Sequence, residues 1–373
     1  MATEALVWSS EITPVTPVLK TDSSINQVVE KNILKKSDVF FSGNKLFYSN
    51  NPETIKSTML GSVGKWLAKA TMSSNFRFYS WHDNQTGAAV KQWLTINNKG
   101  SSTLNVTLRR LKRGNRYCDA QHLAEYLSGV GDTMSIAIPA NGWNSFILKE
   151  NIPNGSVLSV ICDVEFSGNA VFYEVVVPQT YSGSVNLTGA APTQSDGNTE
   201  YIRGVANYSV GTFTYPKTFL VSDLIKYTPE HWYFDLLPSK IQDYVPINQR
   251  FIDSPEVQNF TDADGAGGLM GGCYATEYYI RIPVKNDTAT PRNIVLMMGS
   301  SYGNYGVVVN MNNAITPTAA QRPTGSHFDC TDKKMREVIK ISNLGYNETH
   351  EIHFRMMVPG GSGSAARFVI KIV

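Results

Sequence analysis

The chain has few charged residues and no long apolar run. Of its 373 residues only 17% are Asp, Glu, Lys or Arg, and the formal net charge is +2. Because the basic residues are mixed with as many acids, charge gives no reason to expect nucleic acid as a partner. No apolar run approaches the ~18–20 residues of a membrane-spanning helix, so we expect no membrane span.

Cysteine is also scarce, and no pair has the C-x-x-C spacing of a zinc site. The four cysteines are Cys118, Cys162, Cys273 and Cys330. One interpretation is a disulfide in each half of the chain, Cys118–Cys162 and Cys273–Cys330, formed in an oxidising compartment. The other is a free thiol at Cys162, because this residue lies on the apolar face of a predicted strand.

The first twenty residues have neither the basic n-region nor the apolar core of a signal peptide. Either the chain stays inside the cell that makes it, or a leader has been removed. Low charge, 29 glycines and many Thr, Ser and Asn residues are typical of secreted proteins. We therefore expect an extracellular or cell-surface location.

Short alternating segments separated by turn residues dominate the first half of the chain. They are 75–81, 88–98, 103–111, 133–139, 145–149, 157–166 and 170–177. In the segment 157–166 the apolar residues share one face of a strand, and these are Leu158, Val160, Cys162, Val164 and Phe166. Such period-two patterning is what a half-buried antiparallel strand needs, and a series of such strands predicts a β-sandwich.

The same patterning returns in the second half, in the segments 277–286, 292–298, 306–312, 335–342, 350–358 and 366–373. The sequence therefore predicts an all-β protein with two antiparallel β-sandwich domains, Ig-like or jelly-roll-like, after an N-terminal arm. The predicted limits are 1–37 for the arm, 38–181 for the first domain, 182–200 for a linker and 201–373 for the second domain. A short helix is expected in 119–129, with Asp119 as N-cap and Gly129 at its end.

The two halves of the sequence resemble each other weakly. Residues 75–86 match 277–288, with Asn84 opposite Asn286. A second match pairs 46–53 with 249–256. We treat an internal duplication as a hypothesis, because short matches of this kind also arise by chance.

Several pieces resemble a family of uncharacterised extracellular proteins of Gram-positive bacteria, whose members often carry a copper amine oxidase N-terminal-like module. These pieces are KLFYSNNPE, FRFYSWHDNQTG with KQWLTINN, LNVTLRR, YIRGVANYS, GGCYATEYYIRIPVKNDT, SSYGNYG and the closing FRMMVPGGSGSAARFVIKIV. The module itself is absent here. The resemblance implies an envelope-associated protein with two sandwiches. It implies neither copper nor amine oxidation, and it supplies no catalytic residues.

Two short motifs resemble known sites without completing them. Gly299 to Gly303 match the G-x-S-x-G elbow of hydrolases around Ser301, but the following residues predict a strand where the elbow needs a helix. Asp262 and Asp264 resemble the start of a calcium loop, although an EF-hand would need further ligands and a Glu at its twelfth position. We keep these two aspartates as a weak calcium candidate and expect no other cofactor.

Histidine and tryptophan offer further candidates. His350 and His353, three apart on a strand, point to opposite faces and do not share a metal easily. His82 is interpreted as a loop-end residue that caps a turn. Four tryptophans form either a stacking platform for a polysaccharide or part of the cores, and these are Trp81, Trp93, Trp143 and Trp232. The basic cluster Arg109, Arg110, Lys112, Arg113 and Arg116 is interpreted as a solvated rim.

No catalytic set of residues emerges, so we expect a protein that is not an enzyme. The leading hypothesis is a structural or assembly protein of a cell-surface layer, filament or envelope. It would form a homo-oligomer or polymer through sandwich edges and the N-terminal arm, within residues 3–20. The alternative is a carbohydrate-binding or adhesin module. An enzyme with a calcium-supported site is the least favoured hypothesis.

Overall fold

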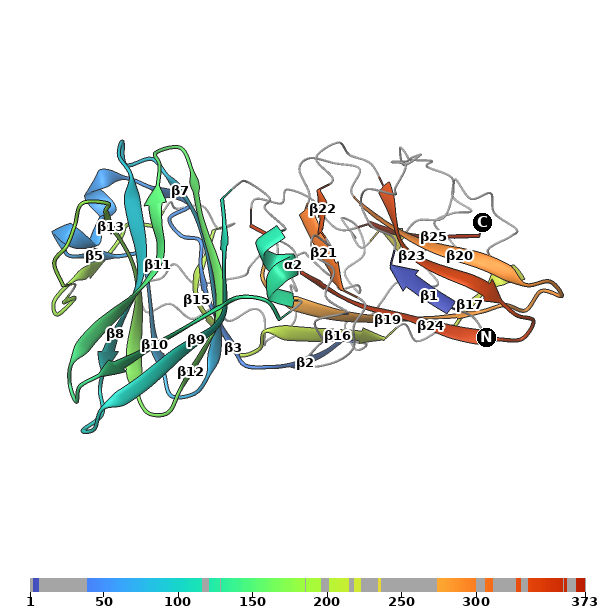
Figure 1. Ribbon diagram of the computed structural model, residues 1–373, viewed down its shortest axis with the longest axis horizontal. Coiled ribbons are helices and arrows are strands. Elements are labelled where there is room, and N and C mark those ends of the chain that lie inside the picture. Colours follow the sequence, from blue (N-terminus) through green and yellow to red (C-terminus); the bar gives the residue numbers. More distant parts are fainter. Residues whose placement is uncertain are drawn as a thin grey trace. The chain divides into compact units, whose positions relative to one another are not determined.

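The structure is a computed structural model. It describes residues 3–6, 39–115, 121–127, 129–184, 186–195, 201–214, 218–222, 234–235, 274–299, 306–310, 327–329, 335–357, 359–360 and 367–372. Strands make up nearly all of the regular structure, beside the short helix α2 (Gln121–Leu127), so the protein is all-β as predicted. The chain divides into two compact units (Figure 1). We call Gly43–Ser209 unit I, and the described parts of Met1–Ser42, Val210–Arg250 and Gly272–Val373 unit II.

Unit I contains two large sheets. The seven-stranded sheet runs, in spatial order, β10 (Asp132–Ile138), β9 (Leu104–Gly114), β12 (Val157–Phe166), β7 (Phe76–Asn84), β3 (Lys45–Ser49) and β15 (Arg203–Ala206), and β4 (Thr54–Ile55) also pairs with β7. The four-stranded sheet runs β11 (Trp143–Ile152), β8 (Val90–Asn98), β13 (Ala170–Pro178) and β6 (Ala68–Met72). All seven strands predicted in this half of the sequence are present within a few residues of their expected limits.

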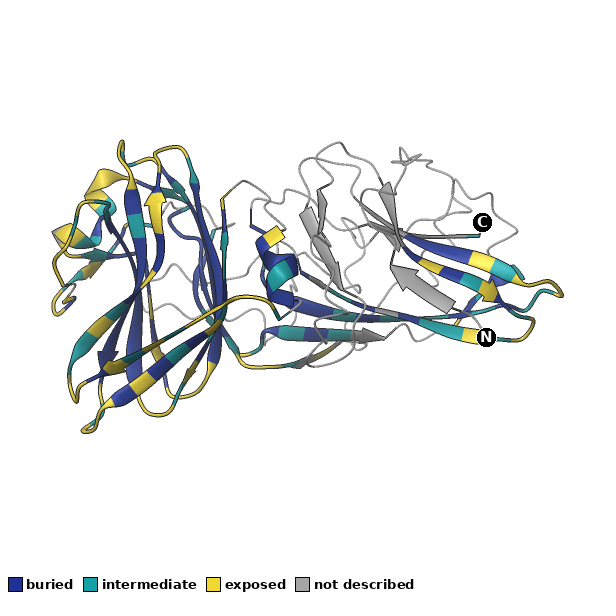
Figure 2. Ribbon diagram, viewed as in Figure 1, coloured by how far each residue is buried: buried dark blue, intermediate teal, exposed yellow. Residues whose placement is uncertain are grey.

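The two sheets of unit I bury one core between them. Alternation puts Phe76 and Phe78 of β7 on the inner face, and Leu94 of β8 and Phe172 of β13 belong to the same buried cluster. Phe76 and Phe172 meet edge-to-face with ring centroids 4.8 Å apart. The dark blue strands of unit I in Figure 2 show this buried layer. Burial of this kind contributes roughly 25 cal/mol for each Å² of apolar surface removed from water.

Smaller elements cover the outer face of the four-stranded sheet. They are two 3-10 helices, η3 (Ser57–Met59) and η4 (Gly61–Val63), and the parallel pair β5 (Lys65–Trp66) and β14 (Ala191–Pro192). Leu187 is buried there beside Trp66, and the Trp66 indole donates to the carbonyl of Ala190 at 3.3 Å. The part of the predicted 182–200 linker that the structure describes is therefore packed against the sheet.

Unit II also contains two sheets. One runs β22 (His327–Asp329), β21 (Gly306–Asn310), β24 (Thr349–Met357), β19 (Glu277–Lys285), β16 (Val210–Thr214) and β2 (Val39–Ser42), and β17 (Phe219–Leu220) also pairs with β19. The other runs β1 (Thr3–Leu6), β23 (Met335–Leu344), β20 (Arg292–Gly299), β25 (Arg367–Ile372) and β18 (Phe234–Asp235). The six strands predicted in this half are all present. Along the chain, the boundaries between the units lie at Ser42/Gly43 and Ser209/Val210. The sequence predicted boundaries at 37/38 and 200/201.

Unit II repeats the strand order of unit I. In both units a long strand, β7 or β19, pairs in parallel with two short strands on one side and antiparallel with β12 or β24 on the other. The next strand along the chain, β8 or β20, lies in the second sheet between β11 and β13, or between β23 and β25. β1 is the exception, because nothing in the described part of unit I occupies its place.

A buried asparagine closes the same corner of each unit. In unit I the Asn84 amide donates to the carbonyls of Ala88 and Ile152, at 2.9 and 3.0 Å. Its oxygen accepts from the Thr86 hydroxyl at 2.8 Å. Gly155, with φ of 77°, donates its N–H to the Asn84 carbonyl at 2.6 Å, so the turn after β11 is held to the end of β7.

Unit II builds this corner again with Asn286. The Asn286 amide donates to the carbonyls of Thr290 and Leu344, at 2.9 and 2.7 Å. The Thr288 hydroxyl donates to its oxygen at 2.6 Å. Asn347, with φ of 59°, takes the place of Gly155 and donates to the Asn286 carbonyl at 2.7 Å.

The weak sequence match between 75–86 and 277–288 therefore reflects a repeated substructure. The second match, between 46–53 and 249–256, is wrong. β16 (Val210–Thr214) takes the place beside β19 that β3 takes beside β7. Residues 249–256 lie outside the described residues.

We predict that Asn84→Ala and Asn286→Ala each weaken their own unit by about 1–3 kcal/mol, because each leaves a buried carbonyl without its donor. Hydrogen-exchange mass spectrometry on the full chain resolves the two units. Asn84→Ala should raise exchange in peptides of β8 and β11, and Asn286→Ala in those of β20 and β23. Unchanged exchange at both corners would contradict this account of the repeat.

Candidate functional site

A layer of polar side chains crosses the core of unit I. The inner face of β7 continues from Phe78 to Ser80 and His82, and both are completely buried. Gln92 of β8 and Glu174 of β13 face them from the second sheet, and they too are fully buried. The layer separates the cluster around Phe76 from a second apolar cluster, which contains Ile55, Leu60, Leu67, Val90, Ile152, Leu158 and Val176.

His82 lies at the centre of this layer. Its Nδ1 is 2.6 Å from the carbonyl oxygen of Pro52, which only accepts, so Nδ1 carries a hydrogen. Its Nε2 is 3.2 Å from Oε2 of Glu174 and 3.1 Å from Oγ of Ser49. The Gln92 amide donates to Oε1 of Glu174 at 2.6 Å and to the Ser80 hydroxyl at 2.5 Å. His82 therefore lies within a strand and was wrongly interpreted as a loop-end residue.

Glu174 is held ionised inside the core. Burial by itself raises the pKa of its carboxyl, but the charge of His82 and hydrogen bonds from His82, Ser49 and Gln92 outweigh burial, and the pKa lies below its ordinary value of 4.5. A carboxyl whose pKa is lower in the folded than in the unfolded chain stabilises the fold above the unfolded pKa. That contribution is lost as the pH falls through the lowered pKa.

Ser49, His82 and Glu174 have the residue types of a hydrolytic triad but not its geometry. In a working triad one ring nitrogen faces the serine and the other faces the acid. Here Ser49 and Glu174 both face Nε2, and Pro52 occupies Nδ1. All three side chains are also fully buried, so a substrate carbonyl does not reach Ser49 in this structure. This trio does not supply acyl-transfer chemistry.

The repeat in unit II shows that the fold does not require the polar layer. The strand register puts Ile282 at the place of Ser80, Val284 at that of His82 and Ile294 at that of Gln92. These three residues are buried. Ile370 takes the position of Glu174 in the register of β25 with β20. Apolar residues thus occupy the four matching positions.

We predict that Glu174→Gln destabilises unit I by about 3–5 kcal/mol at neutral pH, because it removes one member of the buried His82–Glu174 pair. The triple variant His82→Val, Gln92→Ile, Glu174→Ile copies unit II at three of these four positions and should regain most of that loss. Denaturant unfolding at a series of pH values checks this. The native chain should lose stability below pH 4.5, and the triple variant should lose less. Equal acid sensitivity in both would contradict the role given to Glu174.

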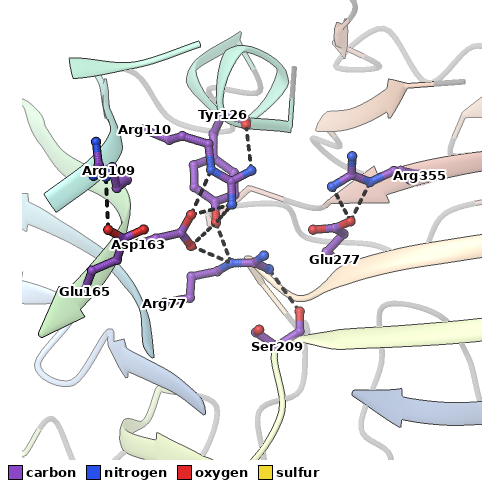
Figure 3. Close-up of polar contacts among 9 residues, drawn as sticks. All are labelled: Arg77, Arg109, Arg110, Tyr126, Asp163, Glu165, Ser209, Glu277 and Arg355. Atoms are coloured by element: carbon purple, nitrogen blue, oxygen red, sulfur yellow. Dashed lines mark hydrogen bonds and ion pairs between the residues drawn. The ribbon is translucent and has the colours of Figure 1, made fainter. Parts of the chain in front are cut away.

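A second polar cluster lies on the outer face of the seven-stranded sheet, at helix α2 (Figure 3). Tyr126 of α2 donates its hydroxyl hydrogen to Oδ1 of Asp163 at 2.5 Å. The same hydroxyl oxygen accepts from Nε of Arg77 at 2.8 Å and from Arg110 at 3.1 Å. Burial raises the pKa of Tyr126, so the hydroxyl stays a donor to the carboxylate.

Both guanidinium groups also contact the Tyr126 ring. The central carbons of Arg77 and Arg110 lie 5.2 and 4.3 Å from the ring centroid, a cation–π geometry. Arg77 further donates to the carbonyl of Ser209 at 3.0 Å, and Arg110 donates to Asp163 at 2.8 Å. Since every named polar group here has a partner, the cluster attaches α2 and Ser209 to the sheet. It does not present an open anion site.

The basic residues of β9 are paired individually with acids. Arg109 contacts Glu165 at 3.0 Å, Lys112 contacts Glu125 at 2.6 Å, and Arg113 contacts Asp132 at 2.5 Å. Arg116 lies outside the described residues. The described part of the predicted solvated rim is therefore a row of ion pairs.

We predict very different costs for two acids on β12. Asp163→Asn leaves Arg77 and Arg110 without their carboxylate and should cost about 3–5 kcal/mol. Glu165→Gln removes a pair whose two side chains are half exposed and should cost at most ~1 kcal/mol. Denaturant midpoints of the two variants, measured side by side, check the contrast. Equal losses would show that the α2 cluster is no more than a surface salt bridge.

The structure separates the other predicted candidates. Trp81 and Trp93 are 1% and 7% exposed, so neither offers a face to a sugar, whereas Trp143 is half-buried. Cys162 is free and buried, so the disulfide interpretation for Cys118–Cys162 is wrong, and burial raises the pKa of its thiol. His350 faces Val284 across β19, in register. Several candidates lie outside the described residues: Cys118, Asp119, Trp232, Asp262, Asp264, Cys273, Ser301 and Cys330.

Sequence analysis missed most of the polar layer, although its signal was present. On β7 the inward positions run Phe76, Phe78, Ser80, His82 and Asn84, so the apolar alternation ends within the strand. Gln92 and Glu174 likewise take inward positions among apolar neighbours. Polar residues on the apolar face of successive strands indicate a buried network.

No membrane-spanning helix is found among the described residues, and they contain no group of three or more acids, histidines or cysteines arranged to hold a metal ion.

No family model and no curated protein matches the chain. Solved structures overlay weakly. A laccase variant from B. aclada gives 9% identity and a TM-score of 0.13, over 79% of this chain and 49% of that one, so this chain spans about half the laccase length. Fet3p, a multicopper oxidase, gives 7% and 0.13 over 89% and 66%. The CBM22-1–CBM22-2 tandem of Paenibacillus barcinonensis Xyn10C gives 9% and 0.12 over 90% and 98%. Overlays this poor carry no functional argument.

Proposed function

We propose that the chain is a non-enzymatic structural protein that assembles with copies of itself into a shell, and that each unit is an eight-stranded jelly roll. Viral capsids use this fold for shells, as lectins and cupins use it for ligands. The observation that carries the proposal is the strand order, which occurs twice in one chain. A fold alone does not define a function.

The strand order of unit I supports the jelly-roll assignment. Numbered along the chain from β6 to β13, its strands lie in the order two, seven, four, five in one sheet and one, eight, three, six in the other. All neighbours in these two series are antiparallel. This is the order produced by folding a long hairpin of strands over itself, with two Greek keys.

Unit II supports the same assignment from β18 to β25. Its strands fall in the same order in the two sheets, again with antiparallel neighbours. Helix α2 lies between the fourth and fifth strands of unit I and is anchored to the sheet by Tyr126. A chain with two such units supplies two sandwiches to a shell.

Unit II also has sheet edges suited to contacts between copies. Among the described strands β2 ends one of the sheets and pairs with β16 alone, and it carries Phe40 with 70% of its surface exposed. β1 ends the other sheet and comes from the start of the chain. Edge strands with free backbone groups and an exposed aromatic are the places where β proteins associate. The predicted homo-oligomer and N-terminal arm belong to this proposal, and the cell-surface location stays a prediction.

The polar chemistry of unit I is consistent with a structural role. The His82–Glu174 layer and the Tyr126 cluster both direct their charges at partners within the chain. Their contribution is specificity of packing, which a repeated building block needs in order to present one fixed surface. We infer no catalytic role for either group.

We predict that purified full-length protein forms large particles of uniform size as its concentration rises. Analytical ultracentrifugation gives the mass, and negative-stain microscopy gives the form. Closed shells support the proposal directly. Extended layers or fibres would instead support the surface-layer or filament hypothesis. A monomer at all concentrations would overturn self-assembly, and specific retention on insoluble polysaccharide would then favour the carbohydrate-binding alternative.

A further inference from the structure

The first residues of the chain add a strand to the last sheet. β1 pairs antiparallel with β23 in unbroken register, from Thr3 opposite Ser342 to Leu6 opposite Ile339. On its other side β23 pairs with β20. Without β1, β23 would therefore be the edge strand of the described sheet. The four residues of β1 therefore cover backbone groups of β23 that a sheet edge leaves open.

The repeat in unit I shows how the fold closes this edge without an added strand. The residues of β11 that match 339–342 are 146–150, since both stretches face the matching residues of β8 and β20. There the register of β11 breaks on both sides of Lys149, whereas the register shifts of β23 lie outside Ile339 to Ile341, which pair with β20 without a break. Arg113 donates to the carbonyl of Leu148 and is itself paired with Asp132 at 2.5 Å. A bulged edge covered by a charged side chain resists strand addition.

The two matching edges are thus treated differently by the same chain. In unit I, a bulge and Arg113 block the edge of β11. In unit II, β1, which is far away in the sequence, pairs with the edge of β23. A jelly roll of this kind is complete without a fifth strand, so β1 is an addition to the fold. An added strand of this kind is a means of connection.

The chain between β1 and β2 is long enough for β1 to leave its own unit. Residues 7–38 separate the two strands, and about thirty extended residues span up to ~100 Å. Strand exchange between copies makes the same backbone hydrogen bonds in either arrangement, so it costs little beyond the entropy of association. Within one molecule a long connection gives an effective concentration of about millimolar or below. In a shell, β1 of a neighbouring copy is present at a similar concentration and competes for the edge of β23.

We propose that β1 of one copy pairs with β23 of a second copy, so that each molecule in the assembly completes the sheet of its neighbour. This inference rests on the proposed self-assembly and specifies the contact that links the copies. The contact is heterologous, because β1 and β23 are different surfaces. It therefore closes into rings or shells when the rotation between copies permits. The bulged and charged edge of β11 restricts the exchange to β23.

A disulfide between positions 5 and 340 tests the proposal, because Ala5 lies opposite Lys340. Directly paired residues in antiparallel strands have Cα atoms within the range that a disulfide spans. Ala5→Cys and Lys340→Cys are made in separate copies, which are mixed before assembly and then oxidised. In this mixture only exchange between copies joins position 5 to position 340. Each single variant oxidised alone is the control for reactions with the native cysteines.

The expected result is a covalent dimer that appears in the mixture, is absent from both controls and disappears on reduction. A chain carrying both substitutions should then form a ladder of longer products. If the double variant gives only an internally linked monomer and the mixture gives no dimer, β1 stays in its own molecule and the proposal is wrong. If no disulfide forms at all, β1 does not lie at β23 and the proposal is also wrong. Particles seen by microscopy in either case would leave self-assembly standing without this contact.

Discussion

The structure of unit I depends on the burial of the apolar inner faces of its two large sheets against each other. In unit I, Phe76 and Phe78 from one sheet and Phe172 from the other meet in the same core. Once two sheets pack face to face, the polar side chains on their inner faces are shielded from water and need hydrogen-bond partners within the protein. The hydrogen bonds of Asn84 and the His82–Glu174 pair are consequences of that constraint.

The repeat provides an internal comparison that a single domain does not. Asn84 and Asn286 make the same bonds at the same corner, so those contacts belong to the architecture. In the described residues the polar layer is found in unit I, whereas Val284 and Ile294 take the positions of His82 and Gln92 in unit II. The layer therefore does not belong to the shared architecture. A buried ion pair gives little net stability over apolar packing, and its effect is on which packing is allowed. The polar layer is therefore a feature of unit I and not of the repeated fold.

The edges of the sheets differ between the two units. Each edge strand of a sheet exposes backbone donors and acceptors that are covered by another strand, blocked by a bulge or side chain, or used to bind a partner. β11 is blocked by a bulge and by Arg113, whereas β23 is covered by β1. The difference between these two otherwise matching edges is the basis of the proposed strand exchange.

Much of the fold follows from the sequence alone, because alternation along a strand is a local property. The thirteen predicted strands, the helix near 121–127 and the corner match of Asn84 with Asn286 all follow from patterns within a dozen residues. Sheet order does not, because the partners of a strand lie far away in the chain. The pairing of β1 with β23, the burial of Trp81 and the meeting of His82 with Glu174 were decided by the tertiary structure. Each depends on which faces and edges come together, and that depends on how the whole chain packs.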